Sequence, residues 1–202
     1  MKKVIVPVAK GFEEIELISV VDVLRRCEIG VEILSLESSP SLVGAHNITL
    51  QADGMFAQNE YEECACIALV GGYENMQRMR AHKGLGEVLR AFASSHRLIA
   101  AICAAPIVLA HFRILSKEFT CYPSCQAEAL RESHADEGLC YVDRRVCYVD
   151  SILTSQGPAT AMEFALRLAD ILHTENLGAY QINADFHTPL VQNIASGLLY
   201  QA

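Results

Sequence analysis

Two hydrophobic patterns alternate along the first 172 residues of the chain. Short runs in which almost every residue is apolar are typical of strands buried on both faces of a sheet, whereas apolar residues that recur every three or four positions are typical of amphipathic helices. The first pattern predicts strands at residues 3–8, 31–36, 47–50, 66–70, 98–102, 119–121, 140–142, 146–149 and 152–154. The second predicts helices at residues 13–26, 74–80, 84–95, 108–112 and 157–172. Such alternation indicates an α/β fold in which helices cover a central sheet.

The expected helix at residues 13–26 places an acidic residue among apolar ones. Its apolar stripe, which we expect to face the sheet, consists of Ile15, Ile18, Val21, Val23 and Leu24. Glu16 is flanked by apolar neighbours in this stripe, so we expect its carboxyl to be buried.

The remaining segments predict one domain without an internal linker. Residues 38–44 have the composition of a turn, and residues 177–200 predict one or two amphipathic helices interrupted near Pro189. We therefore expect a single domain over residues 1–202, with its core at residues 3–172 and a helical C-terminal tail at residues 175–200.

The composition narrows the function classes. The chain has 202 residues and a formal net charge of -8, and no basic run is longer than the pairs Arg25-Arg26 and Arg144-Arg145. A nucleic-acid partner is not expected, because such proteins carry clustered basic residues. No apolar run approaches the roughly 18 residues that span a bilayer, and Lys10 and Glu13 interrupt the first apolar run too early for a signal peptide. We expect a cytoplasmic protein that binds no membrane.

Eight cysteines raise the question of disulfides and metals. In a chain of this length without an export signal, reduced thiols are expected, and the spacings lack the paired C-x-x-C pattern of structural zinc sites. No metal is expected, and most of these cysteines are expected to fill the core. The eight are Cys27, Cys64, Cys66, Cys103, Cys121, Cys125, Cys140 and Cys147.

One of these cysteines ends a buried strand. The segment IAAICAAP at residues 99–106 passes from an apolar run to Cys103, two small residues and Pro106, which is tolerated in the first turn of a helix. This order is typical of a nucleophile elbow, where the N–H groups and dipole of the new helix favour a thiolate. A buried structural cysteine fits the same eight residues.

Two other strands end in residues that suit the same site. Ligands of open α/β sheets bind beyond the carboxyl ends of the strands. Gly71 and Gly72 follow one buried strand, where their N–H groups could stabilise an oxyanion or simply make a tight turn. Glu16 follows the first strand, and burial would keep its carboxyl protonated, so that it donates a hydrogen bond to the sulfur and serves as acid and base.

Five segments together resemble the ThiJ/PfpI superfamily, and within it the branch of the parkinsonism-associated protein deglycase and its bacterial relatives. They are KGFEEIE at residues 10–16, VDVLRR at 21–26, LVGG at 69–72, AAICAAP at 100–106 and LTSQGPAT at 153–160. The resemblance implies a flavodoxin-like three-layer sandwich, a homodimer, and no cofactor. It implies that Cys103 is the nucleophile, Glu16 the neighbouring carboxyl, and Gly71 and Gly72 the oxyanion-binding turn.

Family activities suggest two functions. One is a glyoxalase or deglycase type of enzyme that converts a small reactive carbonyl, such as methylglyoxal, in protection against carbonyl stress. The alternative is an oxidative-stress sensor or redox-regulated chaperone that uses oxidation of the same cysteine.

Two departures from the family pattern bear on this choice. Tyr122 stands where the parkinsonism-associated members have a histidine, and it can serve as a polar partner but not as a proton shuttle near neutral pH. Ala104 stands where the peptidase branch has a histidine, so peptidase activity is not expected.

Overall fold

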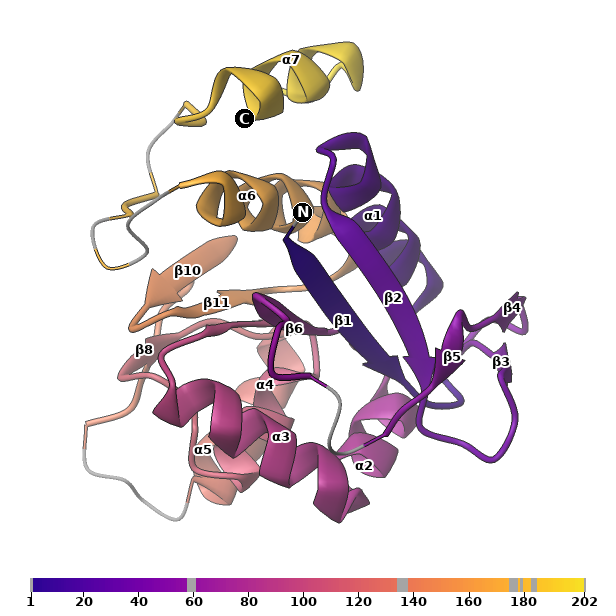
Figure 1. Ribbon diagram of the computed structural model, residues 1–202. Helices are drawn as coiled ribbons and strands as arrows, with labels where there is room; N and C mark the ends of the chain where they lie inside the picture. The colour runs from indigo at the N-terminus through magenta and orange to yellow at the C-terminus, as the bar shows by residue number, and fades with distance from the viewer. Residues whose placement is uncertain are drawn as a thin grey trace.

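Seven strands form one sheet in the computed structural model, which describes residues 2–57, 61–133, 138–174, 178, 180–182 and 185–201 (Figure 1). The strand order is β10-β11-β7-β6-β1-β2-β5. All neighbours pair in parallel except β10 and β11, which are antiparallel. The bounds are β1 (Lys3–Val8), β2 (Gly30–Ser35), β5 (Gly54–Met55), β6 (Cys66–Leu69), β7 (Leu98–Ile102), β10 (Val146–Val149) and β11 (Ile152–Ser155).

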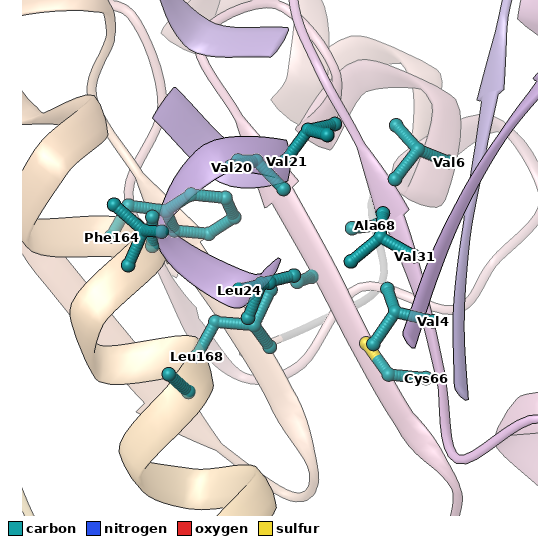
Figure 2. Close-up of a cluster of buried hydrophobic side chains, with 14 of the residues drawn as sticks. Val4, Val6, Val20, Val21, Leu24, Val31, Cys66, Ala68, Phe164 and Leu168 are labelled. Carbon is teal, nitrogen blue, oxygen red and sulfur yellow. The ribbon is translucent and has the colours of Figure 1, made fainter. Parts of the chain in front are cut away.

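Helices cover both faces of this sheet. Alternate residues of β1 enter different cores: Val4, Val6 and Val8 join one cluster, and Ile5 joins the other. The first cluster lies under α1 (Glu14–Arg26) and α6 (Ala161–His173), as Figure 2 shows. The second lies under α2 (Tyr73–Ala81), α3 (Lys83–Ser94), α4 (Pro106–His111) and α5 (Gln126–Glu132). This confirms the three-layer, flavodoxin-like α/β fold with a mostly parallel sheet.

Short elements account for most differences from the expected boundaries. The expected turn at residues 38–44 contains β3 (Ser41–Val43), which pairs in antiparallel fashion with β4 (Thr49–Gln51). Two residues form β5 at the sheet edge, too few for a hydrophobic pattern. The strands expected at 119–121 and 140–142 are the two-residue β8 (Glu118–Phe119) and β9 (Cys140–Tyr141).

The C-terminal tail is interrupted near Pro189, as expected. Thr188 is extended and Pro189 opens α7 (Pro189–Gly197), since a proline fits the first turn of a helix. Before Pro189 the structure describes residues 178, 180–182 and 185–188 of the tail, and none of them is in an α-helix. Within those ranges, the helices are all too short or too polar to cross a bilayer.

Candidate functional site

Cys103 lies at a strained turn between β7 and α4. Its φ of 64° is in the left-handed region, which non-glycine residues rarely adopt. Two backbone hydrogen bonds hold this conformation: Cys103 N–H donates to the Ser155 carbonyl at 3.0 Å, and Tyr122 N–H donates to the Cys103 carbonyl at 2.9 Å. The side chain is only partly buried. Strain at a partly exposed thiol favours the nucleophile elbow over a structural cysteine.

Glu16 reaches the same place from α1. Glu13 caps this helix by accepting the Glu16 N–H at 2.7 Å. The Glu16 side chain is fully buried, and its Oε2 accepts the Gly71 N–H at 2.7 Å. Its other oxygen, Oε1, is buried and meets no hydrogen-bond partner of ordinary geometry among the described residues, while the carboxyl interacts with the Cys103 side chain.

The expected inward stripe of α1 is partly wrong. Ile15 and Ile18 are 58% and 50% exposed, whereas Glu16, Leu17 and Val20 are buried. Glu16 is therefore buried as predicted, although Ile15 and Ile18 of the expected stripe are exposed.

Burial shifts the ionisation of both groups. Desolvation raises the pKa of Glu16 to about 8, so the carboxyl is protonated at neutral pH. Desolvation also raises the pKa of the Cys103 thiol, and the negative charge of an ionised Glu16 raises it further. Hydrogen bonds from the Gly72 and Ala104 N–H groups oppose this shift.

The sequence predicts an elbow that favours a thiolate at Cys103, but in the structure the pKa of this thiol is raised. The N–H groups around the elbow do favour a thiolate, but burial outweighs them. A thiolate at Cys103 depends on a proton at Glu16, because protonation removes the like charge beside the sulfur. The two side chains form a coupled pair that holds one negative charge more readily than two.

The two glycines serve different partners. Gly71 N–H is already donated to Glu16 Oε2, so it does not act as an oxyanion donor as expected. Gly72 N–H is directed to the Cys103 sulfur, together with Ala104 N–H, which the sequence analysis missed. Gly71 also has no space for a side chain: a Cβ there would lie 2.5 Å from Cys103 Cβ and 2.7 Å from Glu16 Oε2.

Tyr122 borders a shallow hollow beside the sulfur. The hollow has a volume of about 190 Å³ and is lined by Tyr122, Arg145, Gln156 and residues 157–160. Gly157 lines the hollow and lies next to the thiol. A Cβ atom added to Gly157 would be 4.0 Å from Cys103 Sγ and 3.0 Å from the Tyr122 ring. A polar role of the Tyr122 hydroxyl stays a prediction.

A larger hollow lies away from this chemistry. It measures about 360 Å³ and is lined by Tyr61, Phe92 and Arg97, among others. Arg97 directly precedes β7, so this hollow is at the amino end of the sheet. The smaller hollow is the one that contains Gly157, next to the Cys103 sulfur, so we assign the functional site to it, at the carboxyl end of the sheet.

Three potential metal ligands also lie near α1. The ligand atoms of Glu13, Glu14 and His46 are within 4.8 Å of one another. Glu14 already accepts hydrogen bonds from the His46 and Ile48 backbones and contacts His46 Nδ1, and Glu13 caps the helix. The arrangement ties the β3–β4 hairpin to α1 and needs no ion.

The chain is similar to known proteins over most of its length. The model of the DJ-1/PfpI family matches residues 2–171. Protein dj-1beta of Drosophila melanogaster is 34% identical over 200 residues, which cover 98% of this chain and 97% of that protein. Glutathione-independent glyoxalase DJR-1.2 of Caenorhabditis elegans is 30% identical over 160 residues, covering 79% and 82% of the two chains. The structure of oxidized Toxoplasma gondii DJ-1 superposes with a TM-score of 0.84 at 32% identity over both whole chains.

Proposed function

Because the chain belongs to the DJ-1/PfpI family, we propose that it is a cysteine-dependent, cofactor-free enzyme that converts α-oxoaldehydes such as methylglyoxal to 2-hydroxy acids such as lactate. The observation that supports this most is the pairing of a buried, protonated carboxyl with a thiol at a strained elbow. The name of the C. elegans relative, a glutathione-independent glyoxalase, supports the same substrate class.

The first step is addition of sulfur to the aldehyde. The Cys103 thiolate forms a bond to the aldehyde carbon, and the carbonyl electron pair moves to oxygen, which takes the proton from Glu16. The product is a thiohemiacetal. Gly72 and Ala104 N–H groups stabilise the thiolate before attack, and Glu16 is then an ionised base within the site.

The later steps move one hydrogen and consume one water. Glu16 removes the proton from the former aldehyde carbon to give an enediolate and returns it to the neighbouring carbon, which yields a thioester. Water then cleaves the carbon–sulfur bond, with Glu16 as base, and the thiolate is restored. In sum, methylglyoxal and water give lactate and a proton, so no external oxidant or reductant is needed.

The test is turnover by the fully reduced protein. Purified protein incubated with methylglyoxal and no glutathione is expected to form lactate. Absence of lactate above the buffer rate, in protein whose Cys103 is shown to be reduced, would exclude this function.

A second candidate function is oxidation sensing or redox-regulated chaperoning by the same thiol. The protonated Glu16 carboxyl already interacts with the Cys103 side chain, so it can donate to an oxygen added to the sulfur. Tyr122 lacks the proton-shuttle capacity of a histidine. One equivalent of peroxide converts the thiolate to a sulfenate with release of water, and a second gives a sulfinate.

Mild peroxide treatment distinguishes this candidate. We expect mass spectrometry to find two oxygens added at Cys103 while the six buried cysteines stay unmodified, since they are withdrawn from solvent. Equal oxidation across the buried cysteines would count against a sensor.

We also propose a homodimer in the cytoplasm. Ile15 and Ile18 on α1 and Val43 and Ile48 at the β3–β4 hairpin are exposed apolar residues, and Glu14 connects the two elements. A second copy of the chain would remove this surface from water. Sedimentation is expected to give twice the chain mass of 22.2 kDa. The eight free thiols suit a reducing compartment.

A further inference from the structure

Asn75 is a buried polar residue that takes no part in the proposed chemistry. It lies in the first turn of α2 and its side chain is fully buried. Its Oδ1 accepts the Ala9 N–H at 2.8 Å, and its Nδ2 donates to the carbonyls of Val70 at 2.9 Å and Gly71 at 3.0 Å. One side chain therefore joins the end of β1 to the turn that follows β6.

The two carbonyls held by Asn75 belong to the peptide units that serve the site. A trans peptide points its C=O and N–H in opposite directions. The unit with the Val70 carbonyl carries Gly71 N–H, which donates to Glu16 Oε2 at 2.7 Å. The unit with the Gly71 carbonyl carries Gly72 N–H, which is directed to the Cys103 sulfur.

We propose that Asn75 is the positioning residue that orients both N–H groups, one toward Glu16 and the other toward Cys103. The importance of Asn75 for turnover rests on the proposed function. By holding the two carbonyls on the side away from the site, the Asn75 amide fixes the direction of both N–H groups. Glu13, the N-cap residue of α1, supports the second unit because its N–H donates to the Gly71 carbonyl at 3.1 Å.

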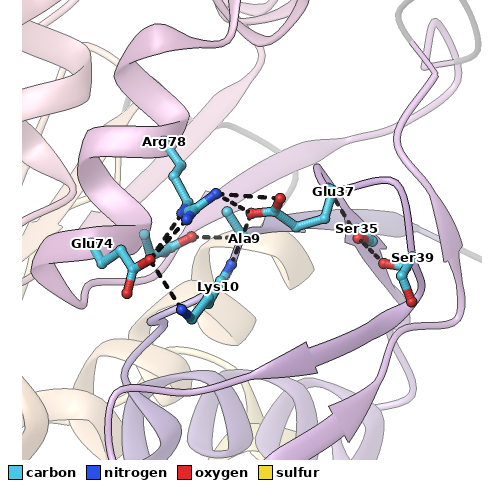
Figure 3. A network of polar contacts seen from close by, with 8 residues as sticks. Ala9, Lys10, Ser35, Glu37, Ser39, Glu74 and Arg78 are labelled. Carbon is cyan, nitrogen blue, oxygen red and sulfur yellow. Dashed lines mark hydrogen bonds and ion pairs between the residues drawn. The ribbon is translucent and has the colours of Figure 1, made fainter.

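The surface contacts between the same elements do not replace Asn75. Lys10, Glu37, Glu74 and Arg78 form a network of ion pairs around the end of β1 and the start of α2, beside Ala9 (Figure 3). These side chains are partly exposed to solvent, where ion pairs restrict the backbone weakly. Gly72 has a φ of 90°, and a glycine allows wide rotation of the backbone at this position. The hydrogen bonds of the buried Asn75 amide are therefore what restricts the peptide unit between Gly71 and Gly72.

The test compares Asn75→Leu with Ser35→Ala. Leucine keeps the branched shape and the number of side-chain heavy atoms of asparagine and removes all three hydrogen bonds. Ser35 is a matched control, because it is buried in the neighbouring strand and bonds to the Ser39 carbonyl and the Glu37 N–H but touches neither glycine. The readout is the rate of Cys103 alkylation by iodoacetamide as a function of pH, in protein whose fold is verified by circular dichroism.

Asn75→Leu is expected to slow alkylation of Cys103 at neutral pH at least tenfold and to move the profile to higher pH, because the thiolate loses a hydrogen bond. Ser35→Ala is expected to keep the native profile. If Asn75→Leu does not fold, Asn75→Ser supplies the same comparison. A native profile in the folded Asn75 variant, or the same shift in Ser35→Ala, would overturn the proposal. Alkylation needs no substrate turnover, so this result stands apart from the lactate test.

Discussion

The Cys103→Ser protein is expected to form lactate from methylglyoxal at a rate at least about 10³-fold below that of the native protein. A serine hydroxyl at this position is a far weaker nucleophile than a thiolate, because it stays protonated near neutral pH. The elbow itself is expected to persist, since its two hydrogen bonds use the Cys103 backbone N–H and carbonyl. Lactate formation is measured on fully reduced protein without glutathione.

Cys140→Ser is the matched control for this substitution. Cys140 is an exposed free thiol on β9, outside the site, so its loss is expected to leave turnover unchanged. Native turnover in Cys103→Ser would show that another group carries the reaction. A loss of turnover in Cys140→Ser would show that thiol removal in general, rather than the elbow, is responsible.

Gly71→Ala is expected to disable the site and destabilise the fold together. The new methyl group would lie 2.5 Å from Cys103 Cβ, 2.7 Å from Glu16 Oε2 and 2.9 Å from Cys103 Sγ. Cys103 cannot retreat, because Ser155 and Tyr122 hold its backbone. Overpacking of this kind costs about 1–3 kcal/mol. We expect a lower free energy of unfolding in urea, and slower alkylation of Cys103 than in the native protein.

Gly197→Ala provides the contrast. A Cβ at Gly197 meets no atom within 4 Å in the described part of the chain, and this residue ends α7. The free energy of unfolding and the Cys103 reactivity of the Gly197→Ala protein are expected to match those of the native protein. Equal stability and reactivity of Gly71→Ala and Gly197→Ala would contradict the close packing of the site.

The sequence could predict the order of the strands and helices and the residues at their ends. The site depends on where strands end, and buried apolar runs such as β7 show this clearly. The stripe of α1 was harder to predict, because Ile15 and Ile18 are as apolar as buried residues although they face solvent. Composition alone does not tell a core face from a face that another chain would cover.

The sequence could not predict the direction of individual N–H groups. Gly71 and Gly72 are identical residues, yet one N–H is donated to a carboxyl and the other to a sulfur. That division follows from the position of Asn75, a polar residue in α2 whose burial no local pattern indicates. The balance between burial and hydrogen bonding at Cys103 likewise depends on packing in three dimensions.

The raised pKa of Glu16 also links the site to stability. The unfolded carboxyl loses its proton near pH 4.5, whereas the native one keeps it up to about pH 8. Between these values the native state binds more protons than the unfolded state, so the contribution of this group to stability falls as pH rises. The substitution Glu16→Gln removes this dependence, and the variant is expected to gain stability relative to the native protein as pH rises through the window.

Protonation of Glu16 beside Cys103 is the property on which both proposed functions depend. Infrared difference spectroscopy of native protein against Glu16→Gln measures it directly, through the C=O band of a protonated carboxyl. We expect this band to be present at pH 7, to be absent from the variant, and to disappear with a midpoint near pH 8. A carboxyl already ionised at pH 6 would contradict the coupled pair.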